Sequence, residues 1–140
     1  EIDMCAMMLP RALRVADFMT SNVLTVTPDM DVLAAMGLLL SRRVSGAPVI
    51  DGRGNLVGML TERDCLQTLV ISGYHDQRES GQVAQFMSRA VITVEAEANL
   101  LSVAQRFLAI AYRRYPVVAE QQLVGIISRR DVLRAIATHA

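Results

Sequence analysis

The chain repeats itself, and this internal repeat limits its fold more than any other feature of the sequence. A run of five residues recurs 68 positions later with one substitution, and further segments follow in the same order at an offset of 68 or 67. The matched pairs are residues 15–19 with 83–87, 23–26 with 91–94, 48–49 with 116–117 and 56–58 with 123–125. One copy of about 50 residues would bury too little surface to be stable alone. We therefore expect two copies that pack together with pseudo-two-fold symmetry.

The hydrophobic pattern predicts the same elements in each copy: a short helix, a strand, a helix, a two-stranded hairpin and a closing helix. In the first copy these are helix 13–19, strand 23–26, a helix to 43 capped by Asp31, strands 47–50 and 56–60, and helix 62–71. In the second copy they are helix 83–87, strand 91–94, a helix to 112 capped by Asn99, strands 115–118 and 123–127, and helix 129–139. This order predicts an α+β fold with a small mixed sheet. The helix after Asp31 is apolar nearly all round, so we expect it to be buried on more than one side.

The repeat also suggests a division of the chain into four parts. Residues 1–12 form a Met-rich N-terminal arm and residues 13–71 the first repeat. Residues 72–82 are polar with two glycines and form a linker, and residues 83–140 are the second repeat.

Composition argues against several classes of function. Lys plus Arg equals Asp plus Glu at 14 each, so net charge gives no reason to expect nucleic acid or an anionic membrane as partner. The apolar runs are too short for a membrane span. Cys5 and Cys65 lie in unlike contexts, which favours reduced thiols in a cytoplasmic protein. His75 and His139 are far apart, so we expect no metal site.

A motif at the start of each closing helix carries the chemistry. Gly58-x-x-Thr61-x-x-Asp64 returns as Gly125-x-x-Ser128-x-x-Asp131. One interpretation is a capping box, with each glycine allowing close packing of strand and helix. The other is a ligand site in which the hydroxyl meets phosphate, the carboxylate accepts hydrogen bonds from a ribose diol, and the glycine leaves room for the ligand.

The residues of this motif are suited to recognising a ligand rather than to catalysis. Arg63 and Arg130 follow the hydroxyl residues closely and can neutralise a phosphate. Nothing in the motif pairs a nucleophile with a base, so we expect a binding protein and no enzyme.

Taken together, the motifs resemble a tandem pair of cystathionine β-synthase (CBS) domains, often called a Bateman module. The resemblance rests on the two glycine motifs, on the recurring Val-Ala-x-Phe-Met, on Thr25-Val26 and Thr93-Val94, and on the Pro-Val strands, and it covers residues 13 to 137. It implies two βαββα repeats and a regulatory module that senses AMP, ADP or ATP, or in some members S-adenosylmethionine, in clefts between the repeats. It places the Ser or Thr on phosphate, the Asp on ribose, and the Thr-Val strand and the residue before Pro around adenine. The implied ligand-binding residues are Thr25, Val26, Ala47, Thr61, Arg63 and Asp64 in the first site, and Thr93, Val94, Tyr115, Ser128, Arg130 and Asp131 in the second.

The two sites differ in charge. Arg129 replaces Glu62, and Arg113-Arg114-Tyr115 replaces Ser45-Gly46-Ala47. These cations predict that the second site binds a phosphate-bearing ligand more tightly. Tyr115 could stack on adenine or could instead fill its pocket.

The closing helices also predict an oligomer. Each carries an apolar stripe, at Cys65, Leu66, Leu69 and Val70 and at Val132, Leu133, Ile136 and Ala137. The stripe packs on its own sheet or, as the resemblance implies, pairs two modules into a homodimer. A structural dimerisation module with empty clefts is the alternative to a nucleotide sensor. The sensor reading implies a regulated protein whose identity the sequence leaves open, and neither reading involves nucleic acid or membrane.

Overall fold

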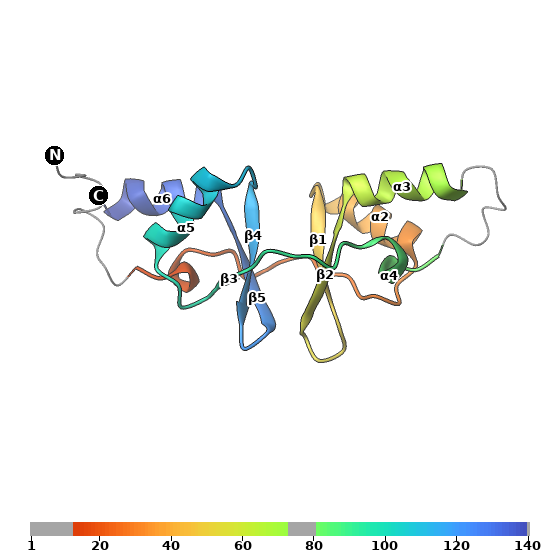
Figure 1. The fold of residues 1–140 in the computed structure, drawn as a ribbon, viewed down its shortest axis with the longest axis horizontal. Coiled ribbons are helices and arrows are strands. Elements are labelled where there is room, and N and C mark those ends of the chain that lie inside the picture. Colours follow the sequence, from red (N-terminus) through yellow and green to blue (C-terminus); the bar gives the residue numbers. More distant parts are fainter. Residues whose placement is uncertain (1–12, 73–80, 140) are drawn as a thin grey trace. The chain divides into compact units, whose positions relative to one another are not determined.

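The computed structural model describes residues 13–72 and 81–139, without the side chains of residues 69, 71 and 72. The chain divides into two compact units (Figure 1). Unit 1 contains the N-terminal segment up to Val23 together with Ile92–Ala140, and unit 2 is Leu24–Val91. The described helices include none with the length and hydropathy needed to cross a membrane.

Unit 2 is a hairpin covered by helices. Its elements are α2 (Val32–Arg42), β1 (Gly46–Ile50), β2 (Leu56–Thr61), α3 (Glu62–Ser72) and α4 (Val83–Phe86). Asp31 caps α2 as predicted, because its carboxylate accepts a hydrogen bond from the amide of Ala34 at 3.1 Å. β1 and β2 pair antiparallel, and their turn is held by the Asp51 carboxylate, which accepts from the amides of Arg53 and Asn55. The core of the unit consists of Val26, Ala35, Leu39, Ala47, Val49, Leu60, Val83 and Met87.

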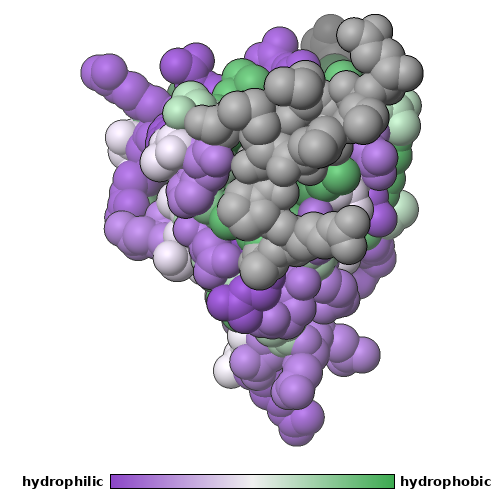
Figure 2. All heavy atoms as spheres, turned by 90° about the vertical axis from the view of Figure 1, so that its left-hand side faces the viewer, coloured by the Kyte–Doolittle hydropathy of each residue, from purple (hydrophilic) through white to green (hydrophobic). Residues whose placement is uncertain are grey.

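Unit 1 has the same plan with one more strand. Its elements are the 3₁₀ turn η1 (Val15–Asp17), β3 (Val94–Glu95), α5 (Leu100–Ala109), β4 (Arg114–Ala119), β5 (Gln122–Ser128) and α6 (Arg129–His139). β3 runs parallel to β4, and β4 pairs antiparallel with β5. Its core includes Val15, Val94, Leu100, Val103, Phe107, Tyr115, Val117, Ile127, Val132 and Ala135. Where the described residues are visible in Figure 2, they carry mainly hydrophilic side chains, with smaller hydrophobic areas among them.

Each unit takes its opening segment from the other repeat. In unit 1 the segment before Val23 belongs to the first repeat, yet Val15 lies in the unit core and Thr20 pairs with Ile126 through hydrogen bonds of 2.8 and 2.9 Å. In unit 2, Ser88 pairs with Met59 in the same way, with two bonds of 2.9 Å. The repeats therefore exchange these segments, and neither compact unit coincides with one repeat.

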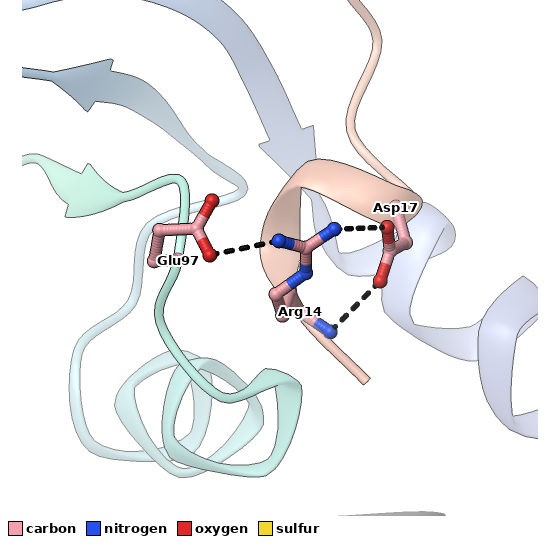
Figure 3. Close-up of polar contacts among 3 residues, drawn as sticks. All are labelled: Arg14, Asp17 and Glu97. Atoms are coloured by element: carbon pink, nitrogen blue, oxygen red, sulfur yellow. Dashed lines mark hydrogen bonds and ion pairs between the residues drawn. The ribbon is translucent and has the colours of Figure 1, made fainter. Parts of the chain in front are cut away.

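An ion-pair cluster fastens the opening segment to unit 1 (Figure 3). The Arg14 guanidinium donates to Glu97 at 2.8 Å and to Asp17 at 3.2 Å. These contacts raise the pKa of Arg14, and the bond from Arg14 lowers the pKa of the Asp17 carboxyl. The equivalents of Arg14 and Asp17 in unit 2 are Gln82 and Gln85, which are neutral. There the backbone amide of Gln82 donates to Gln85 Oε1 at 2.7 Å.

The first strand of each repeat is shorter than predicted. Over residues 23–26 only Val26 pairs, in a single parallel bridge to Val49, and β3 begins at Val94 rather than at residue 91. Both runs lie where the chain passes from one unit to the other, between Val23 and Leu24 and between Val91 and Ile92. The β-branched residues there keep the backbone extended, but only the last part of each run meets a strand.

The prediction that α2 is buried on more than one side is wrong for the described chain. Val32, Ala35 and Leu39 are buried, whereas Leu33 is 51% and Leu40 78% exposed. A single hairpin can cover only one stripe of a helix, so the apolar residues outside that stripe stay at the surface. α5 also ends at Ala109, earlier than the expected residue 112. The predicted arm 1–12, Cys5, and most of the linker with His75 lie outside the described residues.

Candidate functional site

The motif of unit 2 forms a closed capping box. Thr61 ends β2, and its amide and its hydroxyl both donate to Asp64 Oδ2, at 2.8 and 2.9 Å. The Asp64 amide donates back to Thr61 Oγ1 at 3.3 Å. The capping interpretation is confirmed. Asp64 Oδ1 accepts no hydrogen bond from the part of the chain that the structure describes.

The motif of unit 1 forms the same box with different donors. The Ser128 amide donates to Asp131 Oδ2 at 2.8 Å, and the Asp131 amide donates to Ser128 Oγ at 3.2 Å. Arg134 Nη1 lies 3.2 Å from Asp131 Oδ1 and forms an ion pair with it. Asp131 is only 6% exposed. Here the second carboxylate oxygen is occupied, while the Ser128 hydroxyl proton has no acceptor among residues 13–72 and 81–139.

The motif glycines leave no room for a ligand, and that prediction is wrong. A Cβ added to Gly58 would lie 2.8 Å from Met87 Sδ and 2.8 Å from the Ser88 carbonyl oxygen. At Gly125 it would lie 2.6 Å from Met19 Sδ and 2.8 Å from the Thr20 carbonyl oxygen. Each glycine thus admits the methionine and backbone of the exchanged opening segment. The alternative interpretation, that each glycine allows close packing, is right about packing. The neighbour, however, is the opening segment of the other repeat and not the helix that follows the strand.

The remaining candidates lie on the strands beside each box. In unit 2, Val26 bridges to Val49, and Ala47 pairs with Leu60, the residue before Thr61. In unit 1, Val94 pairs with Val117 and Tyr115 pairs with Ile127, the residue before Ser128. Val26, Ala47, Val94 and Tyr115 are buried, and Thr25 and Thr93 are half-buried. The fold therefore brings each predicted set onto neighbouring segments of backbone, and its apolar members belong to the core of their unit.

Tyr115 is a core side chain in this structure. It is fully buried, with its ring centroid 4.8 Å from that of Phe107 and 5.7 Å from that of Tyr112. Its hydroxyl donates to the Arg106 carbonyl at 3.4 Å, and burial raises the pKa of the phenol. The ring exposes no face, which favours the alternative in which Tyr115 fills the pocket rather than stacking on adenine.

Four exposed arginines surround the box of unit 1. Arg114 pairs with Ser128 across the hairpin, and the Arg129 amide donates to the Arg113 carbonyl at 3.2 Å. Arg130 follows in the first turn of α6. In unit 2 the equivalent residues are Ser45, Gly46, Glu62 and Arg63, whose formal charges sum to zero. The charge difference noted in the sequence therefore falls on residues close to Ser128 in the chain or across the hairpin.

Two features of the site were not predicted. The contact from Arg134 to Asp131 could have been found from the i, i+3 spacing of opposite charges on a helix. The methionine contact to each glycine joins distant parts of the chain and has no local signal. Within the described ranges, His, Cys, Asp and Glu side chains nowhere gather in threes that could hold a metal ion.

Comparison with known proteins identifies the family. A model of the CBS domain matches residues 15–71 and 83–138. The chain therefore belongs to the CBS domain family and carries two copies of the domain. Such pairs are generally regulatory modules.

Individual relatives agree with this assignment. The uncharacterized protein MJ1225 of Methanocaldococcus jannaschii is 30% identical over 125 residues, which are 89% of this chain and 43% of that protein. The chloroplastic CBS domain-containing protein CBSX1 of Arabidopsis thaliana is 34% identical, over 86% of this chain and 63% of its own. The chain thus spans about half of these two relatives. The solved structure of CBSX2 in complex with AMP matches with a TM-score of 0.76 and 33% identity, over 89% of this chain and 96% of that one.

Proposed function

We propose that the chain is a regulatory module that binds an adenine nucleotide, AMP, ADP or ATP. The observation that supports this most is that both CBS copies keep a complete hydroxyl–carboxylate box beside the strands where the family places its ligand. The likeness to a structure that contains AMP supports the same ligand class.

Each residue set has a role in this proposal. The hydroxyls of Thr61 and Ser128, with Arg63 and Arg130, bind phosphate oxygens at a helix start, where the helix dipole favours an anion. Asp64 and Asp131 accept hydrogen bonds from the ribose hydroxyls. Backbone groups of residues 25–26 and 47, and of 93–94 and 115, line the adenine. None of these groups forms a nucleophile–base pair, so we propose binding without turnover.

The module is also proposed to form a homodimer through its exposed helix faces. Leu66 and Val70 on α3 are 66% and 80% exposed, and Leu133 on α6 is 63% exposed. Apolar side chains gathered in this way favour burial against a partner. The proposed output is an effect on a regulated protein, and a purely structural dimerisation module is the alternative.

A ligand panel separates sensor from structural module. Purified chain is heated with AMP, ADP, ATP or S-adenosylmethionine, and the unfolding midpoint is recorded. A nucleotide at 100 times its Kd should stabilise the chain by about 2.7 kcal/mol. The Asp64→Asn and Asp131→Asn double variant serves as control, since asparagine can still cap each helix but offers one acceptor fewer to ribose. If no ligand raises the midpoint of the wild-type chain, the structural alternative is correct.

A further inference from the structure

We infer that the two units recognise different parts of the nucleotide: unit 1 selects for phosphate, and unit 2 for the ribose diol. This inference rests on the proposed function and adds to it a division of specificity that the two nearly identical motifs do not suggest. It rests on the hydrogen bonds of two groups in each box: the hydroxyl, and the outer carboxylate oxygen, which is the Oδ1 atom that does not accept from the amide of the hydroxyl residue.

The first difference concerns the hydroxyl. In unit 2 the Thr61 hydroxyl already donates to Asp64 at 2.9 Å. To bind a phosphate oxygen it would have to give up that bond. In unit 1 the Ser128 oxygen accepts from the Asp131 amide, and its proton has no acceptor in the described chain. The serine can therefore donate to phosphate without losing a bond.

The second difference concerns the outer carboxylate oxygen. Asp64 Oδ1 accepts nothing from the described residues, so a ribose hydroxyl can approach it directly. Asp131 Oδ1 is held by Arg134 at 3.2 Å, and a ribose must compete with that guanidinium. The equivalent of Arg134 in the first repeat is Gln67, which carries no charge. Arg134 is therefore a specificity-determining residue, because it competes with ribose for the Asp131 carboxylate of unit 1.

The residue opposite each hydroxyl strengthens the contrast. Arg114 pairs with Ser128 across the hairpin, so the two side chains project from the same face of the sheet. Gly46 pairs with Thr61 in unit 2, and a Cβ placed on it would lie 3.4 Å from Thr61 Cγ2, which shows how close these positions are. A phosphate on Ser128 therefore meets a cation that forms no ion pair within the described chain. A phosphate on Thr61 meets none at that position.

Variants that are altered in one unit allow the ligand preference of the other unit to be measured by itself. Asp64→Asn weakens the ribose acceptor of unit 2 and leaves unit 1 unchanged. Asp131→Asn combined with Ser128→Ala and Arg114→Gln weakens the ribose and phosphate groups of unit 1 and leaves unit 2 unchanged. Titration calorimetry then gives the Kd of adenosine and of AMP for each variant. We expect AMP to bind at least tenfold more tightly than adenosine to the Asp64→Asn chain, and within about threefold of adenosine to the chain with the three unit 1 substitutions.

A reciprocal exchange tests the role of Arg134. Added to Asp64→Asn, Arg134→Gln should tighten adenosine binding about threefold to fivefold, the size expected for removing a competing exposed ion pair. Added to the three unit 1 substitutions, Gln67→Arg should weaken adenosine binding by a similar factor. Arg114→Gln in the Asp64→Asn chain should weaken AMP while leaving adenosine unchanged. A merely structural role of Arg134 would alter the unfolding midpoint but not the ratio of the two affinities.

The outcomes are distinguishable. If the wild-type chain binds neither AMP nor adenosine, the proposed function fails and this inference with it. If AMP binds but the AMP-to-adenosine ratio is equal in the two chains altered in one unit, or does not respond to Arg134→Gln and Arg114→Gln, the proposed function stands and the division of specificity is wrong.

Discussion

Gly125→Ala tests whether the exchanged segment holds unit 1 together. The new Cβ would lie 2.6 Å from Met19 Sδ and 2.8 Å from the Thr20 carbonyl oxygen. The thioether can rotate away, but the carbonyl belongs to a backbone that is hydrogen-bonded to Ile126 at 2.8 and 2.9 Å. Relief of the clash therefore requires the opening segment to withdraw from β5.

The expected loss follows from three terms. Overpacking of a core position costs about 1–3 kcal/mol. Weakening two backbone hydrogen bonds adds about 1–2 kcal/mol. Replacing glycine recovers about 0.5 kcal/mol from the reduced freedom of the unfolded chain. The variant should thus lose about 3 kcal/mol of unfolding free energy.

Urea unfolding followed by circular dichroism measures this loss. Gly37→Ala is the matched control, because nothing lies within 4 Å of its added Cβ and it sits in helix α2. The control should gain about 0.5–1 kcal/mol from helix propensity. Gly125→Ala combined with Met19→Ala should recover only part of the loss, since the Thr20 carbonyl remains. An unfolding midpoint for Gly125→Ala at or above that of wild type, with an unchanged m-value, would refute the packing argument.

Three further predictions concern single residues. Asp64→Ala should cost about 1 kcal/mol through loss of the helix cap and Asp64→Asn clearly less, as thermal unfolding without ligand can show; equal losses would contradict the capping role. Because burial raises the pKa of Tyr115 in the folded chain, its contribution to stability is complete below the unfolded pKa of about 10 and is lost as pH rises through the folded value. Absorbance at 295 nm should then show one tyrosine ionising together with unfolding, and Tyr115→Phe should abolish that component. The amides of Arg53 and Asn55 lower the pKa of Asp51, so its contribution is complete above about pH 4 and fades as pH falls through the folded pKa; carbon-13 NMR titration should find its midpoint below the usual aspartate value.

Local signals in the sequence predicted most of the fold. Asp31 and Asn99 mark the starts of α2 and α5, and both caps are formed as expected. The strands expected at residues 47–50 and 56–60 form the first hairpin, and both capping boxes follow from a hydroxyl and an aspartate three residues apart. Each of these features depends on residues that are neighbours along the chain.

Features that depend on distant residues were not predictable in this way. The strand over residues 23–26 was overestimated because its pairing is limited by the passage between units. The motif glycines were misjudged because Met19 and Met87, which fill the space beside them, come from far along the chain. Tyr115 left two roles open, and only its contacts with Phe107 and Tyr112 favour the filling role.

The exchange of opening segments says something about how such a chain could arise. A single repeat cannot complete its own unit, because the methionine that fills the space beside its glycine is carried by the other repeat. Before duplication, a lone repeat would have had to borrow that segment from a second molecule, as in a domain-swapped dimer. Joining two copies in one chain turned this exchange into an intramolecular one, which no longer depends on protein concentration.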